Sequence, residues 1–467
     1  MARYASSASN ANLLIMKSRL LFLIAIITLC APTSFAQQRT SRLTLANEVR
    51  KEFLHAWNGY KQYAWGHDDL KPLTKSYHDW YAEPLLMTPV DALDTMTLMG
   101  LNGEAKSTRE YIATHLSFNK DIDVQNFEIT IRLLGGLLSN YQMTGDKRLL
   151  NLAEDLGNRL LPVFESPTGL PYRYVNLKTG RVRGNATNPA EAGTLLIEFG
   201  TLARLTHRQV FYDKAKRALV EIYNRRSPIG LVGTWINVET GAWTDTDSHI
   251  SGAIDSYYEY LLKCAILFDD QDCRRMWEAS LTAINQHLRD ETKGRMKPEL
   301  WYGHADMNTG KRTTTTYGAL DAFFPAVLAL SSDLNRAQLL QESSFKMWQK
   351  NDIEPEEIDY QTMGIKSPGY PLRPEIVEST YYLYHFTRDP KYLHMGETMW
   401  RDFVKYCRTD AGYAALKSVV TKEKNDSMQS FLFAETFKYF YLLFAPPRTL
   451  NFDKVVFNTE AHPMRRK

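Results

Sequence analysis

The chain has 467 residues, with 56 lysines and arginines against 53 aspartates and glutamates, and a formal net charge of +3. This near balance does not favour a nucleic-acid or anionic-membrane partner, because both select for a basic excess. The four cysteines form no Cys-x-x-Cys pair and no zinc-ligand spacing.

The first 36 residues are predicted to form a cleavable signal peptide. Lys17 and Arg19 precede an apolar run at 20–31, and the small residues before Gln37 match a cleavage site. The run is too short for a stable membrane span, and no later segment is long and apolar enough for one. An uncleaved anchor is the alternative. We therefore expect a periplasmic or secreted protein.

The mature chain is expected to be one domain at 37–467. Met16 is a second candidate start, because residues 16–36 alone make a complete signal peptide. Removal of residues 1–36 takes away three basic side chains and no acid, which leaves 53 of each sign. No linker, charge block or low-complexity tract divides the remainder, so we predict one closed architecture and a monomer.

Three cysteines remain after cleavage: Cys264, Cys273 and Cys407. Cys264 and Cys273 flank a short predicted turn between helices and are candidates for a disulfide in an oxidising compartment. Buried thiols are the equally favoured alternative, and both readings stay open.

Helical periodicity dominates the sequence and predicts about fourteen helices in seven pairs. A terminal β-prone stretch at 450–459 follows them and is expected to plug one end of the ring as a strand or hairpin. The predicted helix pairs are 42–65 with 90–99, 102–117 with 126–144, 147–163 with 189–206, 208–226 with 252–268, 271–290 with 315–330, 336–351 with 375–387, and 389–407 with 427–444.

The second helix of each pair is the more apolar one and carries an acid, in most pairs near its start. From Glu128 onward the spacing is about 60 residues, which indicates a helical-hairpin repeat. Seven such hairpins predict a toroid with apolar helices inside, whose acids converge on one mouth. These acids are Asp91, Asp94, Glu128, Glu191, Asp255, Asp321, Glu375, Glu378 and Glu435.

Glu128 and Arg132 lie four residues apart in a helix that is apolar nearly all round. A buried charge is costly unless it is paired or used. A structural ion pair and a functional acid are both compatible with this spacing.

The longer connections are expected on one face of the ring, where binding residues usually lie. Aromatic rings with flanking carboxylates and amides suit a carbohydrate, although about half of these aromatics are expected only to pack the loops. The aromatics concerned are Trp80, Tyr81, Tyr172, Tyr174, Trp235, Trp243, Trp301, Tyr302, Tyr360 and Tyr370.

Ordered motifs along nearly the whole mature chain resemble those of class I α-mannosidases, glycoside hydrolase family 47. Several motifs in order are far more specific than one short pattern. They are Phe53-Leu-His-Ala-Trp57, Gly66-His-Asp-Asp-Leu70, Val90-Asp-Ala-Leu-Asp-Thr95, Phe127-Glu-Ile-Thr-Ile-Arg132, Asp255-Ser-Tyr-Tyr-Glu-Tyr-Leu-Leu-Lys263, Leu372-Arg-Pro-Glu-Ile-Val-Glu-Ser379, Phe431-Leu-Phe-Ala-Glu435 and Phe457-Asn-Thr-Glu-Ala-His-Pro463.

Within the family, the chain looks closest to the ER degradation-enhancing mannosidase-like branch, and its signal peptide is typical of a bacterial member. Phe323-Phe-Pro325, Glu378-Ser-Thr-Tyr381 and Gly412-Tyr-Ala-Ala-Leu-Lys417 carry this resemblance. The resemblance implies an all-α (α/α)7 barrel plugged by a C-terminal β-hairpin. It also implies calcium-dependent removal of terminal α-1,2-linked mannose, with inversion, from a mannose-containing oligosaccharide or glycoprotein glycan.

The resemblance also implies roles for individual residues. Glu128 is matched to the general acid, acting through a water. Glu375 is matched to the general base, and Asp255 is a third essential acid that rivals it for this role. Arg132 beside Glu128 by itself works against an acid role, because a cation lowers the pKa of a carboxyl group.

The implied calcium ion is bound directly by Thr459, through its hydroxyl and carbonyl oxygens. Water molecules held by acids complete its shell of six to eight oxygens. Those acids are Glu191, Glu378, Glu435 and Glu460, and Arg132, Arg373, Glu191, Glu378, Phe431 and Glu435 are matched to the mannose pocket.

The sequence departs from the family pattern in places. Gly318-Ala-Leu-Asp-Ala-Phe323 stands where the processing branch has a His-Leu-x-Cys-Phe motif, so the pocket contact made by that histidine is absent. Gln429 replaces a frequent glutamate. Two other functions are compatible with the sequence: a mannose-glycan-binding protein with little or no turnover, and another (α/α)-barrel carbohydrate enzyme such as an epimerase or lyase.

Overall fold

The computed structural model describes residues 42–294 and 298–466. The predicted signal peptide at 1–36 lies outside the described residues. Within the described ranges, no helix combines the length and hydropathy that a membrane crossing needs.

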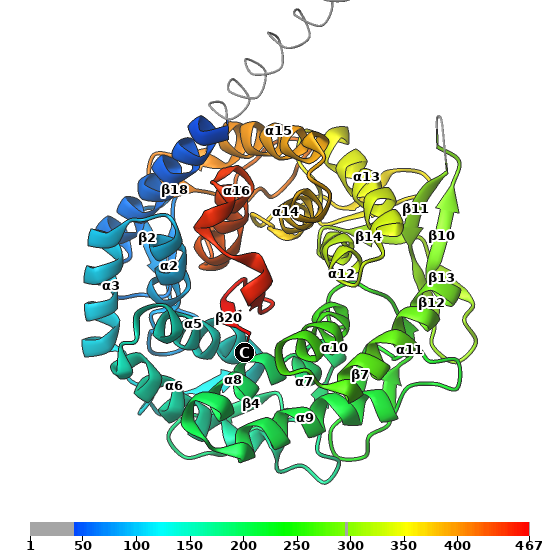
Figure 1. Cartoon of the computed structure of the whole chain (residues 1–467), viewed down its shortest axis with the longest axis horizontal. Helices are drawn as coiled ribbons and strands as arrows, with labels where there is room; N and C mark the ends of the chain where they lie inside the picture. Colours follow the sequence, from blue (N-terminus) through cyan, green and yellow to red (C-terminus); the bar gives the residue numbers. More distant parts are fainter. Residues whose placement is uncertain (1–41, 295–297, 467) are drawn as a thin grey trace, which may run out of the picture.

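Fourteen helical stretches in the described part of the chain form two concentric rings (Figure 1). The outer ring carries the more polar helices of the predicted pairs. It consists of the helix at 42–63, α3 (Asn102–His115), α6 (Lys147–Leu160, continued by the 3-10 turn Leu161–Phe164), α9 (Gln209–Asn224), α11 (Gln271–His287), α13 (Leu334–Lys350) and α15 (Pro390–Cys407).

The inner ring carries the apolar helices, which are buried on most sides. Several of them are interrupted, so one stretch contains more than one element. The stretches are α2 (Met87–Leu98); α4 (Asn126–Ile129), η1 (Thr130–Leu134) and α5 (Gly135–Thr144); α7 (Pro189–Gly193) and α8 (Leu196–Thr206); α10 (Asp255–Phe268); η3 (Leu320–Phe323) and α12 (Phe324–Leu330); α14 (Glu375–Thr387); and η4 (Leu432–Thr436) and α16 (Phe437–Phe444).

Contacts between neighbouring inner helices close the ring. α2 packs on α5, α5 on α8, α8 on α10, α10 on α12, α12 on α14 and α14 on α16. The last inner stretch then meets the first, because η4 packs on α2. The predicted (α/α)7 arrangement with apolar helices inside is therefore confirmed.

Six short turns connect each inner helix to the next outer helix, and each contains a residue with positive φ. Four of these turns continue with an aspartate that caps the outer helix through its side chain, as Asp146 does for Arg148 N–H. Only two of the six positive-φ residues are glycines, so most of these helix ends carry no glycine signal in the sequence. They are Gly100, Gly145, His207, Asp269, Ser332 and Arg388.

The long connections, expected only as loops, contain short antiparallel strands. Their lengths of two to four residues are too short for a periodic sequence signal. They are β1 (Asp69–Lys71), β2 (Ser76–His78), β3 (Asp123–Gln125), β4 (Tyr174–Asn176), β5 (Val182–Arg183), β6 (Ala186–Thr187), β7 (Trp235–Asn237), β8 (Trp243–Asp245), β9 (Asp247–Ser248), β10 (Arg289–Thr292), β11 (Glu299–Tyr302), β12 (His304–Asp306), β13 (Arg312–Thr314), β14 (Thr316–Gly318), β15 (Glu357–Asp359), β16 (Gly364–Ser367), β17 (Arg408–Thr409) and β18 (Gly412–Tyr413).

Four of these strands end in the same tight turn, begun by Asn176, Asn237, Asp306 or Asp359. In each turn the side-chain oxygen accepts backbone N–H bonds from the residues two and three positions later. The repeated Asn/Asp-x-x-Thr sequence is a local signal for these turns.

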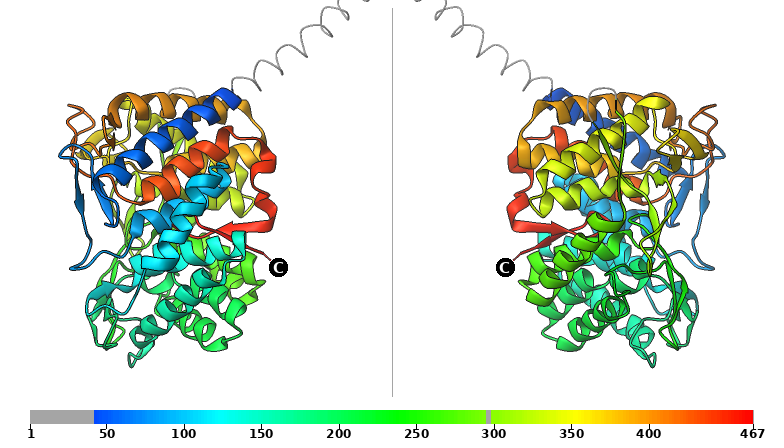
Figure 2. Two further views of the ribbon diagram at one scale, coloured as in Figure 1. Left: turned by 90° about the vertical axis from the view of Figure 1, so that its left-hand side faces the viewer. Right: turned by 90° about the vertical axis from the view of Figure 1, so that its right-hand side faces the viewer.

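The terminal hairpin lies at the centre of the ring, as predicted (Figure 1). β19 (Val455–Phe457) pairs antiparallel with β20 (Pro463–Arg465), and β19 packs on α10 while β20 packs on α5. In side view the C-terminal end lies at one face of the ring and the β1–β2 hairpin at the other (Figure 2). The terminal β19–β20 hairpin therefore closes the ring from the face opposite the long connections.

Buried charges hold this hairpin in place. The Nδ1 and Nε2 atoms of His462 lie 2.7 Å and 3.2 Å from carboxylate oxygens of Asp94 and Asp91. Lys438 forms an ion pair with Asp94 at 2.8 Å and donates to the Ala461 carbonyl at 2.6 Å. Burial alone would lower the pKa of His462, but the two aspartates outweigh it and raise the pKa to about 9.

Two consecutive glycines allow the hairpin to approach α5 closely. A Cβ atom on Gly135 would lie 2.6 Å from the Asn458 side-chain nitrogen, and one on Gly136 would lie 3.2 Å from the His462 ring. Both distances are shorter than ordinary packing contacts, so larger residues would displace the hairpin.

Cys264, Cys273 and Cys407 are buried free thiols. The open alternative of a Cys264–Cys273 disulfide is therefore not realised in this structure.

Replacement of His462 by asparagine is expected to lower the free energy of unfolding by about 3–5 kcal/mol, because two buried aspartates lose their shared partner. The folded-state pKa of His462 exceeds its unfolded value, so its stabilisation is complete below about pH 6.5 and is lost as the pH rises through about 9. Urea midpoints at pH 6 and pH 9.5 test this.

The urea midpoint of the wild type should be lower at pH 9.5 than at pH 6. The midpoint of the His462→Asn variant should decrease less between these pH values. His55→Asn, which removes one peripheral hydrogen bond to the Thr409 carbonyl, is the matched control. Equal pH dependence in wild type and His462→Asn would contradict the assignment.

Candidate active site

A cavity of about 530 Å³ lies inside the ring, between the long connections and the tip of the terminal hairpin. Its size is typical of a small-ligand site. All eleven residues predicted from the sequence to be functional line it: Glu128, Arg132, Glu191, Asp255, Arg373, Glu375, Glu378, Phe431, Glu435, Thr459 and Glu460.

Three predicted members of the acidic mouth do not line the cavity. Asp91 and Asp94 form the ionic contacts with His462 and Lys438 beneath it. Asp321 is 1% exposed and accepts a hydrogen bond from Gly318 N–H at 2.8 Å. These acids are placed on the inner helices as expected, but their side chains point into the scaffold.

Two local π-helical turns position charged side chains in the cavity. η1 contains Arg132, and η4 contains Glu435. A π-turn inserts an extra residue in the helical ladder, which shifts the side chains that follow, and such turns are frequent at functional sites. Neither π-turn can be recognised from hydrophobic periodicity, because that periodicity assumes 3.6 residues per turn.

Arg132 connects the first inner helices to the hairpin. Its guanidinium lies 2.9 Å from Glu128, 3.7 Å from Asp91, and in contact with the Glu460 carboxylate. The predicted Glu128–Arg132 pair is thus present. Burial would lower the pKa of Arg132, but Glu460, Glu128 and Asp91 outweigh it and keep the guanidinium charged.

Two carboxyl groups in the cavity are electrostatically suited to proton transfer near neutral pH. Burial raises the pKa of Glu375 to about 7, although Arg373 opposes the shift. Burial likewise raises the pKa of Asp255 to about 7, against a 2.7 Å hydrogen bond from Ser256 N–H. Because both groups lie in one cavity, each also disfavours ionisation of the other.

Glu356, which was not among the residues predicted from the sequence, holds Arg373. The Arg373 guanidinium donates to both carboxylate oxygens of Glu356, at 2.8 Å and 2.9 Å, and lies 3.8 Å from Glu375. This bidentate contact fixes the plane of the guanidinium. Glu356 lies seventeen residues before Arg373 in a long connection, so no local spacing links the pair.

Three residues beside the predicted site residues have positive φ without being glycine. They are Ala253 (φ 74°), Leu372 (φ 72°) and Ala461 (φ 57°). Each carbonyl accepts a hydrogen bond: from Ala190 N–H at 2.9 Å, from the Thr436 hydroxyl at 2.8 Å, and from Lys438 at 2.6 Å. Such strain persists only where surrounding contacts hold it, and it concentrates at functional sites.

The residues around Thr459 offer oxygen atoms suited to a hard divalent cation. Burial raises the pKa of Glu191, that of Glu378 to about 8, and that of Glu460 to about 8. Oε2 of Glu191 is buried without a hydrogen-bond partner. A hydrated cation would supply a water to this oxygen and favour the ionised acids, so the donor set fits calcium.

Among the described residues, no three carboxylates of the cavity form a compact group of ligand atoms. Within the described ranges, the only three His, Cys, Asp or Glu residues with ligand atoms within 4.8 Å of one another are Asp247, His249 and His304. Contact between the acids and calcium through water stays a prediction.

Aromatic side chains form part of the cavity wall, as expected for a sugar site. Trp80 and Trp235 line the cavity, and their rings face Arg132 and Arg173 at 5.0 Å and 5.4 Å. The other predicted aromatics do not line it, and Trp301, Tyr302, Tyr360 and Tyr370 are buried in the scaffold.

The family model described as Glycosyl hydrolase family 47 matches residues 52–466. The rat endoplasmic reticulum mannosyl-oligosaccharide 1,2-alpha-mannosidase is 35% identical, over 93% of this chain and 72% of its own. Alpha-mannosidase I MNS5 of Arabidopsis thaliana is 36% identical, over 96% and 82%. The mouse ER degradation-enhancing alpha-mannosidase-like protein 2 is 34% identical, over 89% and 77%.

Among solved structures, the alpha-1,2-mannosidase from Trichoderma reesei superposes with a TM-score of 0.84 and 28% identity, covering 91% of this chain and 99% of that one. A cellobiose 2-epimerase from Bacillus thermoamylovorans shares the fold alone, with a TM-score of 0.51 and 14% identity over 71% of this chain and 89% of that one. The chain is therefore a glycoside hydrolase that belongs to glycosyl hydrolase family 47.

Proposed function

We propose that this protein is a calcium-dependent α-1,2-mannosidase that removes terminal mannose from mannose-rich glycans with inversion. The observation that carries the proposal is the single cavity in which Glu128, Asp255 and Glu375 meet Thr459. Relatives named for 1,2-alpha-mannosidase activity support the linkage specificity.

The three acids are assigned different roles in proton transfer. Glu128 protonates the leaving glycosidic oxygen through a water, while a carboxylate takes a proton from the attacking water on the opposite side of the sugar. Glu375 is the proposed base, and Asp255 is its alternative. The carboxyl group of Glu375 has one buried oxygen without a partner, which leaves an acceptor for that water's proton.

The other cavity residues bind and orient the sugar. Arg373 is held rigid by Glu356, and Phe431 stands beside Arg132 as an apolar face for the sugar ring. The hairpin tip forms the floor, so a glycan can enter only by its end. This supports removal of terminal residues rather than cleavage within a chain.

Thr459 is proposed to bind calcium through its hydroxyl and carbonyl oxygens, with Glu191, Glu378, Glu435 and Glu460 holding water molecules of the shell. When bound, the ion supplies positive charge that binds sugar hydroxyls. The protein is further proposed to act as a secreted or periplasmic monomer on oligosaccharides or glycoproteins.

Glu128→Gln and Glu375→Gln are each expected to reduce kcat on α-1,2-mannobiose by about 10²–10⁴, because each removes one proton-transfer group. Circular dichroism should remain native. Glu110→Gln, at an exposed acid paired with Arg148, is the control and should keep wild-type activity. Wild-type turnover in either cavity variant would refute its assigned role.

Removal of calcium with a chelator is expected to abolish mannose release, and added calcium to restore it. Thr459→Ala should raise the calcium concentration needed for half activity by at least about tenfold, because calcium loses one of its direct oxygen ligands. Mannose binding without release at any calcium concentration would favour the lectin alternative. Full activity of Thr459→Ala in chelator would favour a different barrel enzyme.

β-Mannose is expected as the first product, because the proposed base delivers water to the face opposite the leaving group. Proton NMR spectra recorded within the first minutes of hydrolysis distinguish the anomers before they equilibrate. First formation of α-mannose would contradict inversion.

A further inference from the structure

The segment from Ser251 to Asp255 connects β9 to α10 and carries one of the cavity acids. Gly252 and Ala253 line the cavity wall together with Asp255. Ala253 has a φ of 74°, a conformation that is strained in a non-glycine residue. The position of Asp255 therefore depends on contacts that hold this strained segment.

A path of two hydrogen bonds leads from Asp255 to a buried histidine outside the cavity. The Asp255 N–H donates to the Ser251 carbonyl at 2.9 Å. The Ser251 N–H donates to Nδ1 of His249 at 3.2 Å. His249 is 6% exposed and does not line the cavity.

The surrounding hydrogen bonds define the tautomer of His249. The Thr234 hydroxyl donates its only proton to the Asp247 carbonyl at 2.7 Å. It can therefore only accept from Nε2–H of His249, 3.1 Å away. Nδ1 then carries the lone pair that receives Ser251 N–H. Burial lowers the pKa of His249 to about 3, which keeps this ring neutral.

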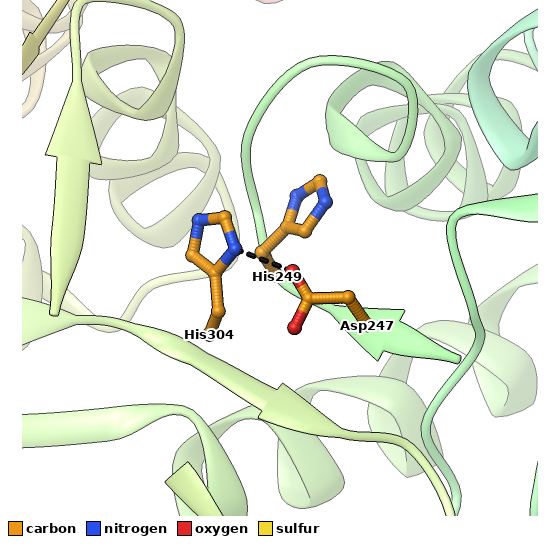
Figure 3. Close-up of side chains that lie close together, drawn as sticks. All are labelled: Asp247, His249 and His304. Atoms are coloured by element: carbon orange, nitrogen blue, oxygen red, sulfur yellow. Dashed lines mark hydrogen bonds and ion pairs between the residues drawn. The ribbon is translucent and has the colours of Figure 1, made fainter. Parts of the chain in front are cut away.

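His304 packs against the ring of His249 and is itself bound by Asp247 (Figure 3). Nδ1 of His304 lies 2.7 Å from the Asp247 carboxylate. The rings of His304 and His249 stack with centroids 4.3 Å apart and planes 29° apart. β9 and β12 supply Asp247 and His304, so the cluster joins two long connections behind the cavity wall.

Two imidazoles and a carboxylate have the composition of a zinc site, but the geometry points elsewhere. A shared ion needs a lone pair from each ring, in the plane of that ring, aimed at one point. Here the rings stack, both nitrogens of His249 are hydrogen-bonded, and only Nε2 of His304 lacks a partner.

We propose that His249 is a positioning residue that holds Asp255 at the cavity wall through the backbone of Ser251. The inference deepens the proposed function, because it assigns support for one of the three acids to a residue that touches neither the cavity nor a sugar. It also predicts that the acceptor at Nδ1, rather than the ring itself, is what the active site needs.

Two substitutions separate these contributions. His249→Phe keeps a ring to stack on His304 but removes the acceptor. His249→Asn loses the ring but places an oxygen where Nδ1 stands. In hydrogen-exchange mass spectrometry of the mature chain, peptides spanning 250–258 should exchange at least about tenfold faster in His249→Phe than in wild type. His249→Asn should stay within about threefold of wild type.

The kinetic readout uses α-1,2-mannobiose with calcium. His249→Phe should lower kcat by about 10–100-fold with little change in KM, because the acid is misplaced while sugar contacts remain. His249→Asn should recover most of this loss. His55→Phe, at a histidine that bonds the Thr409 carbonyl and does not line the cavity, should match wild type.

Unchanged exchange in His249→Phe, or equal impairment of His249→Phe and His249→Asn, would overturn the proposal. So would one equivalent of tightly bound zinc whose removal alone speeds exchange of 250–258. If wild type released no mannose, the proposed function would fail, while the exchange data would still decide the role of His249.

Discussion

The contact between Arg132 and Glu460 joins the inner ring to the terminal hairpin, and the active site depends on it. A ring of seven helix pairs encloses space but has no floor of its own. The hairpin supplies that floor, and it brings Thr459 and Glu460 into a cavity otherwise built by helix starts and long connections. The same guanidinium contacts Glu128, so one buried charge sets the relative positions of the candidate acid and the candidate calcium ligand. Loss of a partner in such a pair leaves an uncompensated buried charge, which couples the integrity of the site to the fold.

Excess negative charge is the second constraint on the cavity. Seven carboxylates of the predicted set line it, whereas Arg132 and Arg373 are its only predicted cations, and each is already engaged by an acid. Burial raises the pKa of several of these groups, so without further positive charge they resist ionisation together. A bound divalent cation would relieve this conflict near Thr459 and leave the more distant acids free to differ in protonation. The crowding of acids thus supports a metal site, even though no three of the described carboxylates have oxygen atoms within 4.8 Å of one another.

The helical repeat and the cavity residues were predictable because both leave periodic or motif signals in the sequence. Fourteen apolar-periodic stretches indicated the ring, and ordered motifs identified Glu128, Asp255, Glu375 and Thr459. Three features were not predicted. The π-turns at Arg132 and Glu435 break the assumed helical period. Glu356 acts through a partner seventeen residues away, and the short strands lie below the length at which alternation can be recognised. Asp91 and Asp94 were placed at the mouth because they lie near the start of a predicted inner helix, whereas partners distant in sequence, Lys438 and His462, draw them into the scaffold.

The site keeps its geometry because hydrogen bonds hold strained backbone residues next to the site residues. Ala253, Leu372 and Ala461 each precede or follow a site residue by one or two positions, and each adopts a φ that its side chain disfavours. A strained residue relaxes unless its peptide groups are held, and here every one of the three carbonyls accepts a hydrogen bond from another part of the ring. The donors come from α7, η4 and α16, so neighbouring repeats hold one another's active-site loops. Ser251 N–H donates a further hydrogen bond to His249, which holds the Ala253 segment from within the connection that leads into α10. The closed ring therefore contributes to the geometry of the site as well as to stability, because the segments beside Asp255, Arg373 and Glu460 are held by donors on other inner helices.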